Sequence, residues 1–181
     1  IGTRRITQTE RRKDALGALQ WLSAQPQVDA SRLALLGWSH GGSTVLAANN
    51  RTHPLVEGFA LRPRLAVAFY PGCETDLKRG YRPASDPLLL VRLADDSTPA
   101  APCQQLESAG PPWVKVLAYE GAHHGFDGPS PVRLRTDVPN GVRPGAGVHV
   151  GGDPAARQAA QQALLQALEK GFAAALEAAL D

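Results

Sequence analysis

Four short apolar runs constrain the fold of this chain more than any other feature, because they lack the polar alternation of a half-exposed strand. They are Arg32–Leu36, Leu65–Tyr70, Pro87–Val91 and Val114–Tyr119. Runs of this kind are typical of strands that are buried on both faces, as in a parallel sheet. Helical or irregular segments separate them, and this order indicates an open sheet. We therefore expect one α/β domain over residues 1–181, with a mostly parallel sheet flanked by helices.

Three segments have the character of helices around this sheet. Apolar residues recur at steps of three and four over Thr7–Ser23 and again over Ala155–Leu180, and Ser43–Asn49 is also expected to be helical. Glu169 and Glu177 give the last segment a polar side, so we expect a surface helix packed on the sheet. The stretch Gly125–Pro154 is rich in glycine and proline, and we expect a long ordered loop without regular structure, close to a functional site.

Charge and composition exclude several classes of protein. Lys and Arg number 19 against 17 Asp and Glu, a net charge of +2, which is too small for a dedicated nucleic-acid binder. No apolar run approaches the roughly 20 residues that span a bilayer, so no membrane segment is expected. Two cysteines, Cys73 and Cys103, can support neither a disulfide-rich fold nor a four-cysteine zinc site. A bridge between them, which would imply an oxidising compartment, and two unrelated thiols are both open.

The chain begins at Ile1 and contains no Met, so we interpret it as a processed chain or a piece of a longer one. The compartment is therefore open between the cytoplasm and the periplasm or exterior. The oligomeric state is equally open.

The strongest motif lies between the first apolar run and the helix that follows it. Its sequence is Gly37-Trp38-Ser39-His40-Gly41-Gly42. A serine in G-x-S-x-G at such a junction occupies a sharp turn that lifts its hydroxyl above the end of the strand. We expect the flanking glycines to be needed because side chains would collide there, and we expect the backbone N–H of His40 to face a developing oxyanion. A glycine-rich packing turn is the alternative.

A nucleophilic serine needs a base, and the base needs an acid that orients it. Asp95 and Asp96 follow the third apolar run, and His123 and His124 follow the fourth. This chain order of serine, acid and histidine is that of α/β-hydrolases. The residues therefore predict a catalytic triad at one edge of the sheet.

These motifs together resemble the dienelactone hydrolase family of the α/β-hydrolase superfamily. The segments that carry the resemblance are the elbow motif, Asp95-Asp96-Ser97-Thr98-Pro99-Ala100 and Tyr119-Glu120-Gly121-Ala122-His123-His124-Gly125-Phe126. In that family the acid stands four residues before a proline, which implies Asp95. The family histidine is the sixth residue of its Tyr-x-Gly-Ala-x-His segment, which implies His124.

The chain departs from the family in two respects. The best-known dienelactone hydrolases carry a cysteine at the elbow, whereas this chain has Ser39, which favours a general ester or lactone substrate. The family also places several strands before the elbow, so the resemblance implies the C-terminal half of the fold and an N-terminally truncated domain. The loop that supplies the second oxyanion donor in this superfamily would then lie in the missing part.

Other functions fit some of the same residues. Asp95, Asp96, His123 and His124 could offer metal ligands, but neighbouring histidines in one loop rarely face one ion, so no metal is expected. A non-catalytic fragment or scaffold is one alternative to an enzyme. A serine peptidase related to the prolyl oligopeptidase group, which has a similar elbow, is another.

The sequence thus predicts a serine hydrolase of small-molecule esters or lactones that works through an acyl-enzyme. We expect Ser39 as nucleophile, His124 as general base and then acid, and Asp95 as the residue that orients His124. Trp38 and Tyr70 are candidate pocket walls. No cofactor is expected.

Overall fold

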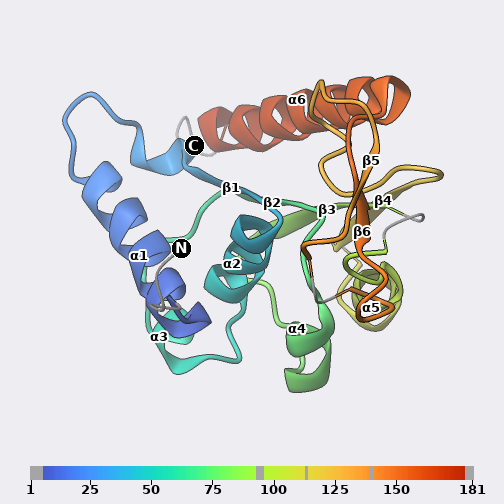
Figure 1. The fold of residues 1–181 in the computed structure, drawn as a ribbon. Coiled ribbons are helices and arrows are strands. Elements are labelled where there is room, and N and C mark those ends of the chain that lie inside the picture. The colour runs from blue at the N-terminus through green and yellow to red at the C-terminus, as the bar shows by residue number, and fades with distance from the viewer. Residues whose placement is uncertain (1–5, 93–95, 113, 139–140, 178–181) are drawn as a thin grey trace.

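The computed structural model describes residues 6–92, 96–112, 114–138 and 141–177. Its centre is a sheet of four parallel strands in the order β1-β2-β3-β4 (Figure 1). The strands are β1 (Ala34–Trp38), β2 (Leu65–Phe69), β3 (Asp86–Arg92) and β4 (Lys115–Tyr119). All three pairings run parallel, from Ala34 opposite Leu65 to Arg92 opposite Tyr119. The predicted α/β class and parallel sheet are therefore confirmed.

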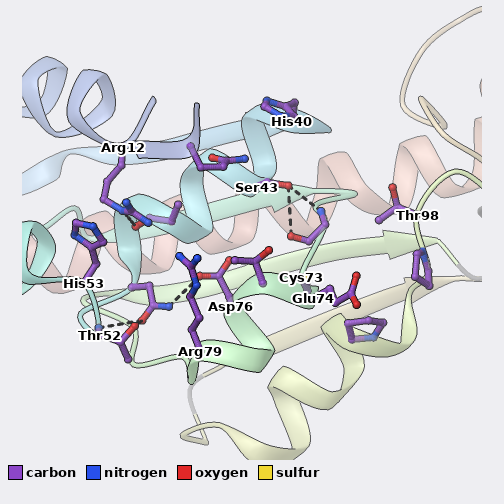
Figure 2. Close-up of a pocket in the computed structure, with 17 residues that line it drawn as sticks. Arg12, His40, Ser43, Thr52, His53, Cys73, Glu74, Asp76, Arg79 and Thr98 are labelled. Carbon is purple, nitrogen blue, oxygen red and sulfur yellow. Dashed lines mark hydrogen bonds between the residues drawn. The ribbon is translucent and has the colours of Figure 1, made fainter. Parts of the chain in front are cut away.

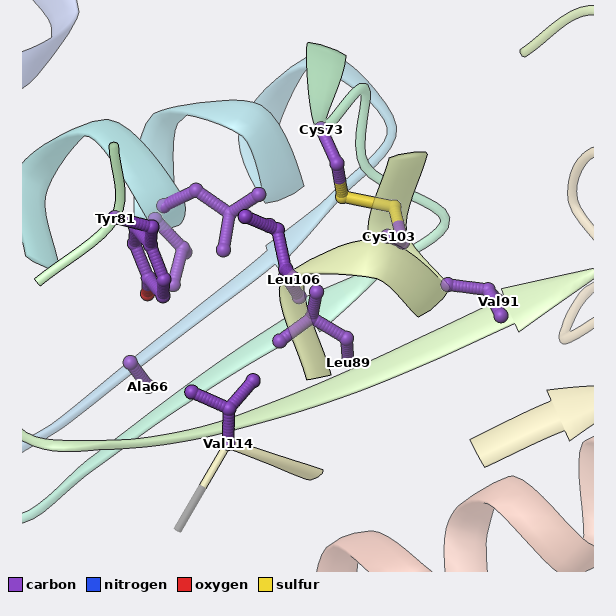
Figure 3. Packing of buried hydrophobic residues seen from close by; sticks show 11 residues of the cluster. Ala66, Cys73, Tyr81, Leu89, Val91, Cys103, Leu106 and Val114 are labelled. Atoms are coloured by element: carbon purple, nitrogen blue, oxygen red, sulfur yellow. A yellow bond between two sulfur atoms is a disulfide. The ribbon is translucent and has the colours of Figure 1, made fainter. Parts of the chain in front are cut away.

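Helices cover both faces of the sheet because side chains alternate along each strand. Val67 and Phe69 of β2 face α6 (Pro154–Glu177), which crosses one side of the sheet as a long helix (Figure 1). Ala66 of β2 faces the other side, where α2 (His40–Asn49) and α5 (Ala101–Ala109) pack. The buried hydrophobic cluster between the sheet and these two helices includes Leu89, Leu106 and Val114 (Figure 3).

Burial differs between the inner and the outer strands. Every residue of β2 is buried, as expected from its apolar run. The outer strands are more exposed: Leu35 of β1 is only half-buried, and Leu117 of β4 is exposed. The expectation that all four strands are buried on both faces is therefore wrong for the outer two, each of which pairs with one strand only within the described ranges.

The two long helices begin at side-chain caps. The helix α1 (Gln8–Ser23) opens with a capping box, in which the Thr7 hydroxyl accepts from the Glu10 N–H at 3.3 Å and the Glu10 carboxylate accepts from the Thr7 N–H at 2.7 Å. At the start of α6, the carboxylate of Asp153 accepts from the N–H of Ala156 at 2.9 Å. The predicted helices over Thr7–Ser23 and Ala155–Leu180 are confirmed within the described residues.

Several short elements were not predicted from the sequence. They are η1 (Ala30–Arg32), α3 (Pro54–Glu57), α4 (Glu74–Arg79), α5, and an antiparallel pair of β5 (Arg133–Arg135) and β6 (Val148–Val150). The last pair shows that the expected absence of regular structure in Gly125–Pro154 is wrong. Gly147 makes the pair feasible because its φ is +75° and a Cβ there would lie 3.1 Å from the backbone of Thr136.

A disulfide joins Cys73, at the start of α4, to Cys103 in α5 (Figure 3). The structure thus supports the bridged alternative for the two cysteines. No helix in the described ranges combines the length and apolar character that crossing a bilayer requires.

Candidate active site

Ser39 occupies a strained turn between β1 and α2. Its φ is 54° and its ψ is −118°, in a region that residues with a side chain rarely adopt. The N–H of Ser39 donates to the carbonyl of Phe69 at 2.9 Å, which ties the turn to the end of β2. The hydroxyl makes no capping bond to α2, although Ser39 is the N-cap residue. The sequence-predicted elbow geometry is therefore present.

The glycines around Ser39 are not equally necessary. A Cβ on Gly37 would overlap the backbone carbonyl of Gly41 and lie 2.8 Å from a methyl group of Val45. A Cβ on Gly42 would lie 2.8 Å from the carbonyl oxygen of Phe69. A Cβ on Gly41 meets no atom within 4 Å. The expectation that a side chain would collide is thus confirmed at Gly37 and wrong at Gly41. At Gly42 a side chain would collide instead, because α2 approaches β2 closely there.

The start of α2 lies directly after Ser39. The first N–H groups of a helix have no partner within the helix, and they carry the positive end of its dipole. His40 provides the first of these N–H groups. His40 is an exposed residue, but the protein still removes some water from its imidazole. This desolvation, with a smaller contribution from Arg11, lowers the pKa of His40 below its ordinary value.

His124 follows β4 and contacts two residues from other loops. Its Nδ1 lies 2.8 Å from the hydroxyl oxygen of Ser97, which follows β3. Its ring centroid lies 4.8 Å from that of Tyr70, which follows β2 and has a φ of 40°. The Tyr70 hydroxyl donates to the carboxylate of Asp127 at 2.7 Å, and the N–H of Gly151 donates to the His124 carbonyl at 2.9 Å.

The loop after β3, called the acid loop below, carries two neighbouring aspartates, Asp95 and Asp96. Asp95, the predicted acid, lies outside the described residues. Asp96 contacts His149 of β6: one carboxylate oxygen lies 2.7 Å from Nδ1 of the ring, and the other accepts from the His149 N–H at 2.8 Å. Burial disfavours ionisation of Asp96, but these bonds from His149 outweigh it and hold the pKa of Asp96 below its ordinary value.

The carboxyl ends of the four parallel strands lie at one edge of the sheet. Ser39, Tyr70, Ser97 and His124 each follow the end of a different strand. Within the described part of the chain, no hydrogen bond joins the Ser39 hydroxyl to His124. The roles of Ser39, His124 and Asp95 as a triad stay a prediction.

Two contacts at this edge were missed by sequence reasoning. The sequence predicts neither the contact of Ser97 with His124 nor that of His149 with Asp96. The signal for His149 was weak: a single histidine between two valines, inside a segment expected to be irregular. Only the folding of β6 against the acid loop gives it a partner.

A cavity of about 540 Å³ opens beside the start of α2 (Figure 2). His40 and Ser43 of α2 border it together with Gly72 and Thr98 from the loops after β2 and β3. The Ser43 hydroxyl accepts from the Gly72 N–H at 2.9 Å, which fixes the loop after β2 against α2. A space of this size is within the range of small-molecule sites.

The other end of the cavity carries buried charge. Arg12 is buried, and its Nε donates to the carbonyl of Ala47 at 2.8 Å. Burial raises the pKa of Asp76 above its ordinary value, although Asn50 donates to its carboxylate at 2.9 Å and Arg12 lies near it. Arg12 and Asp76 therefore compensate each other only in part.

The candidate pocket walls do not line this cavity. The Trp38 ring stacks on Phe69 at a centroid distance of 5.0 Å and is 43% exposed. Tyr70 is buried and lies against His124. A role for either residue in binding stays a prediction.

The chain is similar to known hydrolases in both sequence and structure. Residues 3–63 match the family model of the prolyl oligopeptidase family, a span that includes α1, β1 and the Ser39 turn. A dienelactone hydrolase-like promiscuous phosphotriesterase from metagenomic libraries is 22% identical with a TM-score of 0.64, and the match covers 90% of this chain and 62% of that one. The chain thus spans less than two thirds of that protein.

Two further structures extend the likeness to an esterase and a peptidase. Thermogutta terrifontis esterase 2, phosphoramylated by tabun, is 16% identical with a TM-score of 0.60, covering 96% of this chain and 66% of that one. Porphyromonas gingivalis dipeptidyl peptidase 4 is 20% identical with a TM-score of 0.52, covering 67% of this chain and 20% of that one. With its parallel sheet and the strained serine at the end of β1, the chain therefore has part of the α/β-hydrolase fold, as the sequence predicts.

Proposed function

We propose that this chain is a serine hydrolase that cleaves small-molecule carboxylic esters or lactones. The observation that carries the proposal is the conformation of Ser39, at φ 54° on the strand–turn–helix junction, with a hydroxyl that does not cap its helix. A turn strained in this way presents the nucleophile above the sheet edge, at the start of a helix. The family-model match over this turn and the likeness to hydrolases support it.

In the proposed reaction, Ser39 attacks the substrate carbonyl and transfers its proton to His124. In this scheme the Nδ1–H of His124 donates to the Ser97 hydroxyl, 2.8 Å away, so Nε2 is the nitrogen that receives the proton. His124 then protonates the leaving alcohol, which leaves an acyl group on Ser39. Water attacks this ester with His124 again as base, and the acid and free Ser39 are released. Asp95 is assigned the stabilisation of the His124 cation, on the family resemblance.

The developing negative charge on the carbonyl oxygen needs hydrogen-bond donors. The backbone N–H of His40 is assigned as one donor, because it follows Ser39 at the positive end of α2. The α/β-hydrolase arrangement adds a second donor from another loop. The 540 Å³ cavity beside His40 and Ser43 offers space for the acyl or alcohol part of a small substrate.

A serine peptidase is the second candidate function. The match to the prolyl oligopeptidase family covers α1, β1, α2 and α3, and a dipeptidyl peptidase is among the similar structures. Ser39, His124 and Asp95 would then act on an amide bond.

Substrate hydrolysis by the chain tests both candidates. We expect turnover of short-chain p-nitrophenyl esters, an initial burst of one p-nitrophenol per chain, and little cleavage of aminoacyl-p-nitroanilides. Ser39→Ala should lose the activity, whereas Ser108→Ala, on the exposed side of α5, should keep it. Faster cleavage of the anilides would favour the peptidase. Full esterase activity in Ser39→Ala would contradict the mechanism, and no turnover of either substrate would favour a non-catalytic scaffold.

A further inference from the structure

We propose that Asp96, His123 and His149 form a binding site for a divalent transition-metal ion, with zinc as the expected occupant. The three residues come from the loop after β3, the loop after β4, and β6. One ligand atom from each lies within 4.8 Å of the other two. The site neighbours the proposed hydrolytic centre but uses none of its residues, so it does not depend on the proposed reaction.

Asp96 and His149 already contact each other through atoms that can bind a metal. An oxygen of the Asp96 carboxylate lies 2.7 Å from the His149 Nδ1, and a metal would take the place of the proton between them. The second carboxylate oxygen accepts from the backbone N–H of His149 at 2.8 Å. This bond orients the carboxylate, and ligating carboxylates in metal sites are commonly hydrogen-bonded in this way.

His123 supplies the independent observation that points to a ligand. Its Nδ1 is buried and has no hydrogen-bond partner among the described residues. Its ring centroid lies 5.2 Å from that of His149, with the two planes at 32°. A buried ring nitrogen without a partner is unfavourable, and a metal ion would satisfy it.

The donor set favours zinc over magnesium or calcium. Two imidazoles and one carboxylate suit zinc, whereas the hard cations prefer oxygen ligands throughout. Tetrahedral zinc with bonds of about 2.0–2.1 Å places its ligand atoms roughly 3.4 Å apart. Binding would therefore widen the 2.7 Å contact between Asp96 and His149 and bring the ring of His123 into ligand spacing. A water molecule would complete the coordination.

This site differs from a metal site built on the neighbouring His123 and His124, which the sequence makes unfavourable. Such a site would need both neighbouring histidines to face one ion. In the structure His124 contacts Ser97 and Tyr70 instead, and His149 replaces it beside His123. Only one of the two neighbouring histidines is needed.

Zinc binding to the full chain after treatment with a chelator tests the proposal. We expect one zinc ion per chain in a competition titration, with affinity at least about 100-fold weaker in His149→Ala and His123→Ala, since loss of even an outer-shell partner costs 10–100-fold. His53 caps α3 and is not one of the proposed ligands, so His53→Ala is the control and should bind zinc as the wild type does. Circular dichroism establishes that each variant is folded.

Cobalt(II) gives a second readout that reports the ligands directly. We expect the strong visible absorption of a tetrahedral cobalt site in the wild type and its loss in Asp96→Asn, which conserves the shape of the side chain. Absence of stoichiometric zinc in the wild type would overturn the proposal. So would zinc binding that is unchanged in the folded His149→Ala protein.

Discussion

The serine side and the histidine side of the sheet edge are built in different ways. Ser39 is held by its immediate neighbours: β1 before it, α2 after it, and the close packing of Gly37 and Gly42. The histidine side is held by contacts between distant residues, since 27 positions separate Ser97 from His124 and 53 separate Asp96 from His149. The nucleophile is thus placed by local backbone geometry, and the base by the assembly of three loops. Perturbing each side separately should therefore have different consequences.

The largest effect is expected on the serine side, from Gly37→Ala. The added methyl group would overlap the backbone of Gly41, so the turn must open, and we expect a loss of about 4 kcal/mol in the free energy of unfolding together with the esterase activity. Gly41→Ala is the matched control, because its methyl group meets nothing within 4 Å and α2 gains a better helix former. Urea unfolding of both variants measures the difference. Equal stabilities would contradict the packing account.

The disulfide connects the two sides and should have the next largest effect. Cys73 follows β2 beside α2, and Cys103 lies in the helix that follows the acid loop, with 30 positions between them. Removing a bridge of this span from the chain costs about 3–4 kcal/mol on the chain-entropy account. We expect this loss in the double Cys→Ser variant, measured by urea unfolding without reductant. Wild-type protein in a strong reductant should approach the variant, and a variant as stable as the oxidised wild type would contradict the prediction.

A smaller and local effect is expected on the histidine side. His149→Ala removes the ring contact with Asp96, which is worth about 1 kcal/mol after allowance for the partial exposure of both groups. We expect faster hydrogen exchange in residues 141–151 and in the loop that carries Asp96, with unchanged exchange in α2. The measurement is made in metal-free buffer, so that only the hydrogen bonds are tested. Faster exchange throughout the sheet would instead indicate global destabilisation.

The smallest expected effect is a pH dependence at the far end of the cavity. Burial raises the pKa of Asp76 in the folded state above its ordinary value of 3.8. Stability linked to this group is therefore fully present below pH 3.8 and is lost as the pH rises through the folded pKa. We expect Asp76→Asn to remove this part of the pH slope, measured by unfolding from pH 3.5 upwards. The slope is the test, because Arg12 loses a neighbour in the variant at every pH.

The same contrast explains what the sequence could predict. The elbow at Ser39 was predictable because glycines, a strand and a helix follow one another within a few residues. The parallel sheet was predictable from its apolar runs. The Asp96–His149 contact was not, because it depends on β6 folding back over the acid loop through a positive-φ turn at Gly147. Local patterns report backbone geometry, whereas pairs of side chains from distant loops depend on the whole fold.

The partial exposure of the outer strands was missed for a related reason. The run Val114–Tyr119 has the composition of an inner strand, and composition does not report how many neighbours a strand has. The order β1-β2-β3-β4 places β4 at an edge.

Labelling of Ser39 by a fluorophosphonate probe tests the central claim most directly, because the probe reacts only with an activated serine. We expect one adduct per chain, located at Ser39 by mass spectrometry, and a labelling rate at least about 100-fold lower in His124→Ala, since general-base catalysis contributes 10²–10⁴-fold. An adduct at another residue would contradict the account. So would labelling of Ser39 that is undiminished in His124→Ala but lost in His123→Ala.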